Sequence, residues 1–284
     1  MENELKRKEV DSEESDNELM EIDVNFDFFD FKEVDFLGLK TLLKQSFSAD
    51  HTLFNLSEIS DLIIKQSNVG CTVKADDSTD PYAFISVINL NLHSSNESIN
   101  QIKDYFLEKT RRNINMHKKL IELFDRKIDT NSNNPCVGLI FNERFINMPP
   151  QIFPQMLKMT LEEIEWAVEE GEKFNFDYYL VPAKIYEEIE SKIDNEGNLI
   201  VMEETEPKKK KNKQSNTTTL YFQPEDEIFQ EYCEIKCDFK FSNPNQESDS
   251  KRTFQDFGIE PSRRLLLIKS ENLKKVLADV EMKF

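Results

Sequence analysis

A short, uninterrupted run of apolar residues at Cys136–Phe141 lies near the middle of the chain. The turn-forming residues Asn133–Pro135 precede it, and no polar residue interrupts it. This pattern predicts a strand covered on both faces, because a half-exposed strand would alternate apolar and polar side chains. After the strand, Pro149 forces Met148 into an extended conformation, and Pro150 can only open a helix. We therefore expect a buried strand, a sharp corner and a helix at the centre of the fold.

The rest of the chain divides into similar segments. Strict alternation at 22–28 predicts a strand with one wet face near an edge of the sheet. Asn55 followed by Glu58 predicts a capped helix that ends before Gly70. The remaining patterns predict strands over 69–75, 82–90, 178–186, 198–203, 231–241 and 265–268, and helices over 34–47, within 99–124 and from Ser270, as N-cap, to the end.

Strands and helices are mixed along the chain, and at least two strands have the composition of strands buried on both faces. This order favours an α/β or α+β fold with a central mixed sheet and helices on both faces. We expect residues 1–21 to form a disordered acidic tail, because charged residues far outnumber aliphatic ones there. Residues 22–284 are expected to form a single globular domain with a flexible, lysine-rich linker at about 204–218.

Thr160 is expected to open the most clearly marked helix of the sequence. Thr160 and Glu163 have the spacing of a capping box, and Gly171 fits the position just past the helix end. Glutamates near a helix start are favourable, but late ones oppose the helix dipole and cost roughly a few tenths of a kcal/mol each.

Residues 160–172 contain no base, so this helix carries acid where stability would favour lysine. A charge run is usually a solvated face; the alternative is a surface that binds a basic partner. The candidate partner-binding residues are Glu162, Glu165, the single tryptophan Trp166, Glu169, Glu170 and Glu172.

The formal net charge of −19 extends well beyond the tail. Residues 1–24 contribute −7 and the lysines of 208–213 contribute +5, so the rest of the chain still carries −17. Such a body repels nucleic-acid phosphates and attracts basic proteins. We therefore expect no direct nucleic-acid binding. No apolar run approaches the length of a membrane span, so we also expect no membrane association.

Five lysines follow Pro207 within a polar stretch that has no hydrophobic period. A compact lysine run in a flexible linker has the form of a nuclear import signal. The alternative is a solvated linker that offsets the acidity of the body. We favour the signal, and with it a nuclear protein that can shuttle with the cytoplasm; its residues are Lys208, Lys209, Lys210, Lys211 and Lys213.

The sequence offers little for catalysis. Its six glycines are too far apart to form a phosphate-cradling loop, so we expect no nucleotide cofactor. Three scattered histidines and four sparse cysteines lack metal-binding spacing, and Cys233 and Cys237 are too far apart along one strand to pair. We expect no metal, no enzyme activity and a reducing intracellular compartment.

Several segments resemble the BCCIP family of nuclear proteins. The clearest is Asn142–Pro150, with the sequence NERFINMPP, and the resemblance extends from about Ile22 to the C-terminus. Further matching segments are Leu62–Gly70, Val168–Leu180 and Phe222–Glu227.

This resemblance implies a fold similar to acetyltransferases of the GNAT type. It also implies a fungal-type nuclear chaperone for a basic protein of the large ribosomal subunit, and an adaptor in nuclear export of a lipid kinase. Animal relatives are linked to a DNA-repair tumour suppressor and a cyclin-dependent kinase inhibitor. An acyltransferase that uses acetyl-CoA is the competing class, although Gln66–Cys71 lacks the spacing of a pyrophosphate-binding turn. A passive nuclear scaffold for DNA-repair and cell-cycle proteins is the third class.

Overall fold

The computed structural model describes residues 25–66, 68–75, 78–93, 95–126, 136–188, 219–242 and 259–284. The predicted acidic tail, the predicted strand over 198–203 and the predicted linker with its lysines lie outside these residues.

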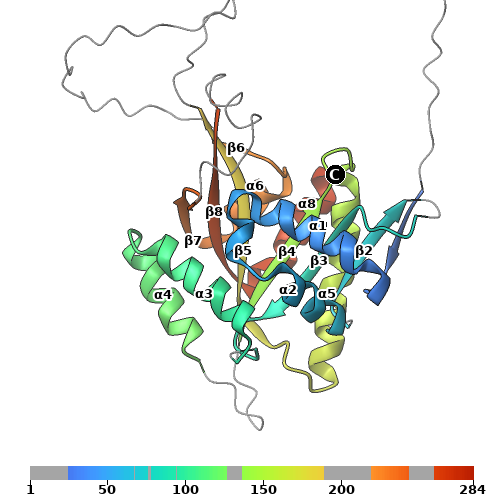
Figure 1. The fold of residues 1–284 in the computed structure, drawn as a ribbon, viewed down its shortest axis with the longest axis horizontal. Helices are drawn as coiled ribbons and strands as arrows, with labels where there is room; N and C mark the ends of the chain where they lie inside the picture. Colours follow the sequence, from blue (N-terminus) through green and yellow to red (C-terminus); the bar gives the residue numbers. More distant parts are fainter. Residues whose placement is uncertain are drawn as a thin grey trace, which may run out of the picture.

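Within the described residues, a mixed sheet of eight strands forms the centre of the molecule (Figure 1). Its order is β1-β2-β3-β4-β5-β8-β7, with β6 paired to β5, and only the β4–β5 pair is parallel. The strands are β1 Phe26–Phe29, β2 Gly70–Ala75, β3 Ala83–Asn89, β4 Cys136–Arg144, β5 Phe176–Glu188, β6 Thr219–Tyr221, β7 Cys233–Phe239 and β8 Ile259–Lys269.

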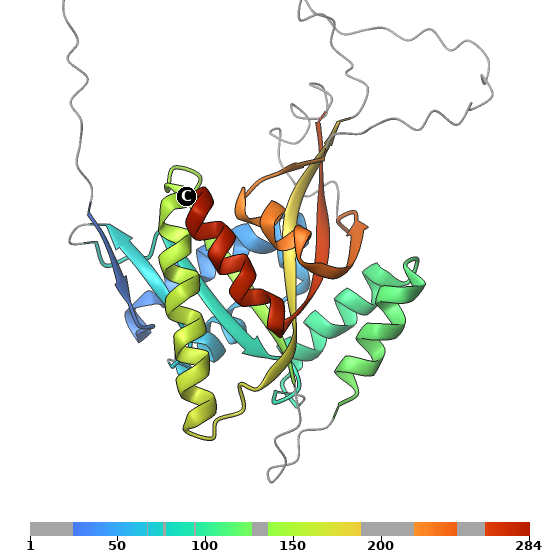
Figure 2. The ribbon, with the colours of Figure 1, turned by 180° about the vertical axis from the view of Figure 1, so that it is seen from behind.

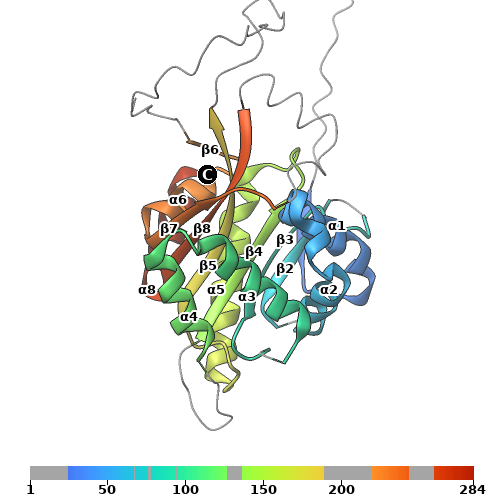
Figure 3. The same ribbon diagram turned by 60° about the vertical axis from the view of Figure 1, so that its left-hand side comes forward.

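Helices cover both faces of the sheet, which confirms the predicted α/β class. One core contains α1 to α4 against the sheet, and the other contains α5, α6 and α8. Figures 1 and 2 show these two sets from opposite sides, and Figure 3 shows the layers from a third direction. The helices are α1 Phe36–Phe47, α2 Leu56–Lys65, α3 Glu97–Thr110, α4 Ile114–Phe124, α5 Phe153–Glu169, α6 Glu225–Glu231 and α8 Ser270–Lys283.

The central strand behaves as its apolar run predicts. β4 lies between β3 and β5, and eight of its nine residues are buried. Leu139 packs into the first core and Ile140 into the second. At Gly138 there is no room for a side chain, because an added Cβ would lie 2.8 Å from Val87 Cγ1 and 2.9 Å from Tyr179 Cδ1.

Several predicted elements are confirmed with shifted bounds. β1 is an edge strand, and β2 pairs antiparallel with β3. The side chain of Asn55 accepts a hydrogen bond from the Glu58 main chain and caps α2. By contrast, the strand expected from residue 231 begins at Cys233, because α6 occupies the residues before it.

The C-terminal segment corrects two predictions. β8 is much longer than the predicted strand over 265–268, because Arg263 and Arg264 extend it although they are charged. Both are buried with acceptors: Arg263 donates to the carbonyls of Ser46 and Pro182, and Arg264 donates to Asp238 at 2.6 Å. Ser270 is the first residue of α8 rather than its N-cap, which is Lys269.

We predict that Gly70→Ala destabilises the fold far more than Gly171→Ala. Both glycines have a positive φ, which disfavours alanine by about 1–2 kcal/mol. At Gly70 the added Cβ would also press on the Ile85 carbonyl and lie 2.8 Å from Ser86 Cα, whereas at Gly171 it meets open space. Denaturant unfolding of both variants measures the difference, and equal losses of stability would contradict the prediction.

Candidate functional site

The acidic helix begins earlier than its sequence suggests. α5 begins at Phe153 and follows a single 3-10 turn at Pro150–Ile152, so the prediction that Thr160 opens the helix is wrong. Pro154 lies in the first turn, where a helix needs no amide donor. The hydroxyl of Thr160 donates to the Met156 carbonyl in the middle of the helix.

This correction changes the electrostatics of α5. Glu162 and Glu163, expected near the favourable N-terminus, lie in the C-terminal half with Glu165 and Glu169. The last turn contains no base to offset the dipole. No acid of this helix therefore lies in the first turn, where the helix dipole would stabilise it, and those near the C-terminus are destabilised by the dipole.

The end of α5 is as predicted. Glu170 is the C-cap, and Gly171 follows with φ +85°. The Gly171 N–H donates to the Val168 carbonyl at 3.1 Å, and the Glu172 N–H donates to the Ala167 carbonyl at 2.8 Å. These two bonds form a Schellman motif, so Glu172 lies just beyond the helix.

The predicted partner-binding residues lie together on the outer side of α5 and at its end. Trp166 is 60% exposed, and Glu172 is partly buried. We call the exposed members of this group the acidic face; they are Glu162, Glu165, Trp166, Glu169 and Glu170.

Within the described residues, only part of this charge is neutralised. Lys274 of α8 forms a salt bridge of 2.6 Å with Glu165, and both side chains are exposed. The Glu172 carboxylate accepts a hydrogen bond from Asn68 at 3.0 Å. Among the described residues, no base or donor pairs with the carboxylates of Glu162, Glu169 and Glu170.

A pocket of about 330 Å³ adjoins the acidic face. Its floor is aromatic, since Phe174, Phe176 and Tyr179 are buried beneath it. Glu165 and Glu169 also line it, so carboxylates stand beside an aromatic surface. This pairing suits a lysine or arginine side chain, whose apolar stem packs on the rings while its charge meets the carboxylates. No sequence pattern indicates this pocket, because it depends on how the start of β5 lies against the end of α5.

Glu163, expected as part of a capping box in the acidic helix, has a different role in the structure. Its carboxylate accepts the Gly70 N–H at 2.7 Å and joins α5 to the start of β2. Burial, and secondarily the negative charges of Asp30 and Glu162, raises the pKa of Glu163 to about 7, although the bond from Gly70 acts in the opposite direction.

The other candidate for a ligand site is the space where β4 and β5 part. The two strands pair only as far as Leu139 and Leu180. Parallel strands that diverge create the crevice where α/β proteins commonly bind ligands. Here the cavity between them measures about 10 Å³, enough for one water molecule.

Polar side chains fill this crevice. Glu143 accepts hydrogen bonds from Lys184 at 2.7 Å, from Gln45 at 2.8 Å and from Gln223 at 3.2 Å. Arg144 pairs with both carboxylate oxygens of Glu225, which is fully buried. These side chains come from α1, β4, β5, α6 and the turn before α6, and together they fill the crevice apart from this small cavity.

The described residues offer little else for chemistry. No group of three or more histidine, cysteine or acidic side chains there is arranged to hold a metal ion. All four cysteines are free, and burial raises the pKa of each thiol, so none is activated as a nucleophile. No helix in the described part of the chain is both long and apolar enough to span a membrane.

Fold and surface thus define an α/β protein with an exposed acidic face beside an aromatic pocket. The sequence profile of the BCCIP family matches residues 21–229, and this chain belongs to that family. It is 41% identical to Protein bcp1 of Aspergillus fumigatus, over 95% of this chain and 90% of that protein. It is 40% identical to Protein bcp1 of Schizosaccharomyces pombe, over 90% of this chain and 88% of that protein.

A crystal structure of BCP1 from Saccharomyces cerevisiae has a similar fold. The two chains superpose with a TM-score of 0.61 over 96% of this chain and 94% of the other, at 24% sequence identity. This similarity supports the architecture described above. The predicted similarity to acetyltransferases of the GNAT type stays a prediction.

We predict that Glu163→Gln stabilises the protein more at pH 8 than at pH 5. The folded chain holds the Glu163 proton up to a pKa of about 7, compared with 4.5 for an ordinary glutamate. Ionisation therefore lowers the free energy of unfolding as the pH rises from about 4.5 to about 7, and glutamine removes this loss. Urea unfolding of both proteins at the two pH values measures it. A difference between variant and wild type that is independent of pH would refute the assignment.

Proposed function

We propose that this chain is a non-enzymatic nuclear chaperone and adaptor. Its client is a basic large-subunit ribosomal protein of the universal L-fourteen type, which it shields during nuclear handling and ribosome assembly. With nuclear transport factors it also supports nuclear protein export, with a lipid kinase as a cargo. Membership of the BCCIP family is consistent with this role.

The acidic face is the observation that carries the proposal. Three of its carboxylates lack a partner among the described residues, and the pocket beside them suits a cationic side chain. A ribosomal protein exposes lysine and arginine where it later contacts RNA, so the acidic face would cover these groups before assembly. Attraction between exposed charges is screened by salt, so binding should weaken as ionic strength rises.

Two other functions compete with the chaperone role. An acyltransferase would need space for acetyl-CoA, and the filled crevice between β4 and β5 argues against it. The prolines at the start of α5 also remove amide donors that a phosphate would need. Calorimetry with acetyl-CoA separates the classes, since micromolar binding would favour the enzyme. A passive scaffold for DNA-repair and cell-cycle proteins would not keep a free basic client soluble.

Nuclear import is a separate part of the proposal and rests on Lys208–Lys213. These lysines lie outside the described residues. Changing all five to glutamine should move a fluorescent fusion of the chain from the nucleus to the cytoplasm. Unchanged nuclear accumulation would remove the signal from the proposal without affecting the acidic face.

The client should bind through the unpaired carboxylates. We expect Glu162→Gln/Glu169→Gln/Glu170→Gln to weaken binding of the basic ribosomal protein at least tenfold at low salt, because three exposed attractions are lost. Calorimetric titration at low and high salt measures both the affinity and its salt dependence. The variant should also show the weaker salt dependence.

The matched control is Asp61→Asn/Glu97→Gln/Asp104→Asn. These acids are exposed on α2 and α3, on the other face of the sheet, and their loss changes the net charge equally. The control should bind the client within about twofold of wild type. Equal weakening by both variants would show that overall charge, rather than the acidic face, attracts the client.

A further inference from the structure

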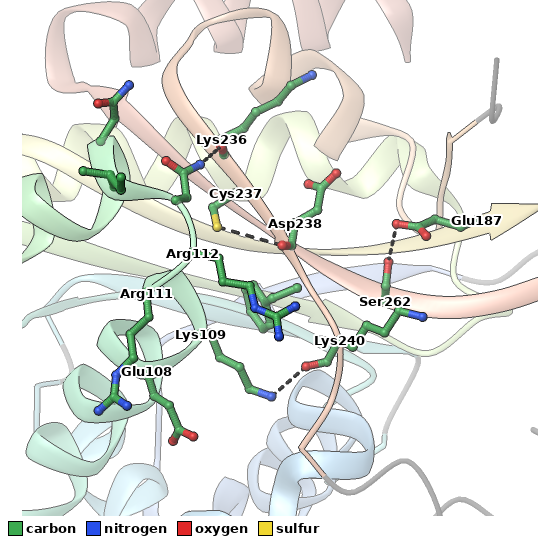
Figure 4. A pocket seen from close by; sticks show the side chains of 14 residues that line it. Glu108, Lys109, Arg111, Arg112, Glu187, Lys236, Cys237, Asp238, Lys240 and Ser262 are labelled. Carbon is green, nitrogen blue, oxygen red and sulfur yellow. Dashed lines mark hydrogen bonds between the residues drawn. The ribbon is translucent and has the colours of Figure 1, made fainter. Parts of the chain in front are cut away.

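A second surface of the molecule has the opposite character. A groove of about 1160 Å³ runs between the α3–α4 hairpin and β7 (Figure 4). Five cations line it, against three acids, in a chain with 36 bases and 55 acids. The cations are Lys109, Arg111, Arg112, Lys236 and Lys240.

One wall of this groove is the open edge of the sheet. β7 pairs with β8 on one side, and no described strand pairs with its other side. Asn113 caps the Lys236 carbonyl at 3.0 Å, and Lys109 caps the Lys240 carbonyl at 2.6 Å. Main-chain groups of alternate residues face the same edge, so the N–H of Asp238 faces the groove between these two caps. An extended peptide could pair there.

Among the described residues, three cations of the groove have no carboxylate partner: Arg111, Arg112 and Lys236. The Lys236 ammonium donates to Gln230 at 3.2 Å, so the two hairpin guanidiniums are the cations with no described partner. Lys109 is 3.6 Å from the buried carboxylate of Asp50, Lys240 pairs with Glu260 at 2.8 Å, and Arg264 neutralises Asp238. Arg111 and Arg112 are exposed, and no described residue pairs with either. In Figure 4, Arg112 extends from the hairpin into the space in front of β7, and Arg111 lies at the rim.

The position of these arginines at the end of α3 gives them a partial structural role. A cation at a helix C-terminus interacts favourably with the helix dipole, and one exposed arginine would be enough for this effect. The helix dipole does not account for the exposed apolar side chains beside the two arginines. Ile114 is 64% exposed at the start of α4, and Ile121, two turns further on the same face, is 42% exposed. The exposed Lys118 lies between them, so the hairpin presents a basic and apolar surface.

We propose that the groove between the α3–α4 hairpin and β7 binds an extended acidic segment of a partner protein. Its carboxylates meet Arg111 and Arg112, whose planar guanidiniums suit bidentate pairing, and its apolar side chains cover Ile114. The groove and the acidic face belong to helices on opposite faces of the sheet. A basic client and an acidic partner can therefore bind together, as an adaptor requires.

A labelled peptide of alternating glutamate and valine tests the groove in the full-length chain, because alternate residues of an extended peptide share one side. We expect the wild type to bind it, and to bind the same peptide with glutamine for glutamate at least tenfold more weakly. Arg111→Gln/Arg112→Gln should bind the glutamate peptide at least tenfold more weakly than the wild type, and Ile114→Asp should also weaken its binding. Fluorescence anisotropy at low salt measures all these affinities.

The control Lys65→Gln/Lys158→Gln removes two exposed cations elsewhere and should leave peptide binding within twofold. The triple glutamine variant of the acidic face should likewise retain peptide binding. Failure of the groove proposal is therefore distinguishable from failure of the chaperone proposal. Equal binding of the glutamine peptide, or equal loss in the lysine control, would overturn the proposal. Tighter binding of a uridine oligonucleotide through the same two arginines would assign the groove to nucleic acid instead.

Discussion

The burial of β4 on both faces is the constraint on which the rest of the structure depends. A strand enclosed between two helical layers must leave the sheet by a corner, and Pro149 and Pro150 shape that corner. The corner places α5 across one face, with Met156, Leu157 and Ile164 inward. A helix fixed on one side by apolar packing presents its remaining side to solvent. The acidic face is therefore held in place by the apolar core, because its own like charges repel one another.

The two candidate surfaces lie on opposite sides of the same sheet. Within the described residues, α5 carries carboxylates without a partner, and the α3–α4 hairpin carries two guanidiniums without a partner. The polar network at Glu143 and Glu225 is different, because its charges are buried and paired and it fills the space where β4 and β5 part.

Apolar periodicity predicted the elements that a single local pattern defines, such as β4 and the capped helix α2. It failed where tertiary partners override the local pattern. Thr160 has the sequence of a helix cap, but Pro154 fits inside the first turn and the helix begins before it. β8 continues through Arg263 and Arg264 because their guanidiniums donate hydrogen bonds to Pro182 and Asp238, which no local pattern reveals. The groove lay beyond any sequence pattern, since its residues are far apart in the chain. The aromatic pocket forms only where the start of β5 lies beside the end of α5.

The central claim is that the acidic face receives the basic client, and Trp166 reports on it directly. It is the only tryptophan of the chain and is 60% exposed beside the unpaired carboxylates. Incorporated as 5-fluorotryptophan, it gives a single fluorine resonance. Addition of the basic ribosomal protein should shift that resonance and protect it from a soluble paramagnetic quencher, and high salt should reverse both effects. A client that binds with undiminished affinity while the resonance and its quenching stay unchanged would contradict the account.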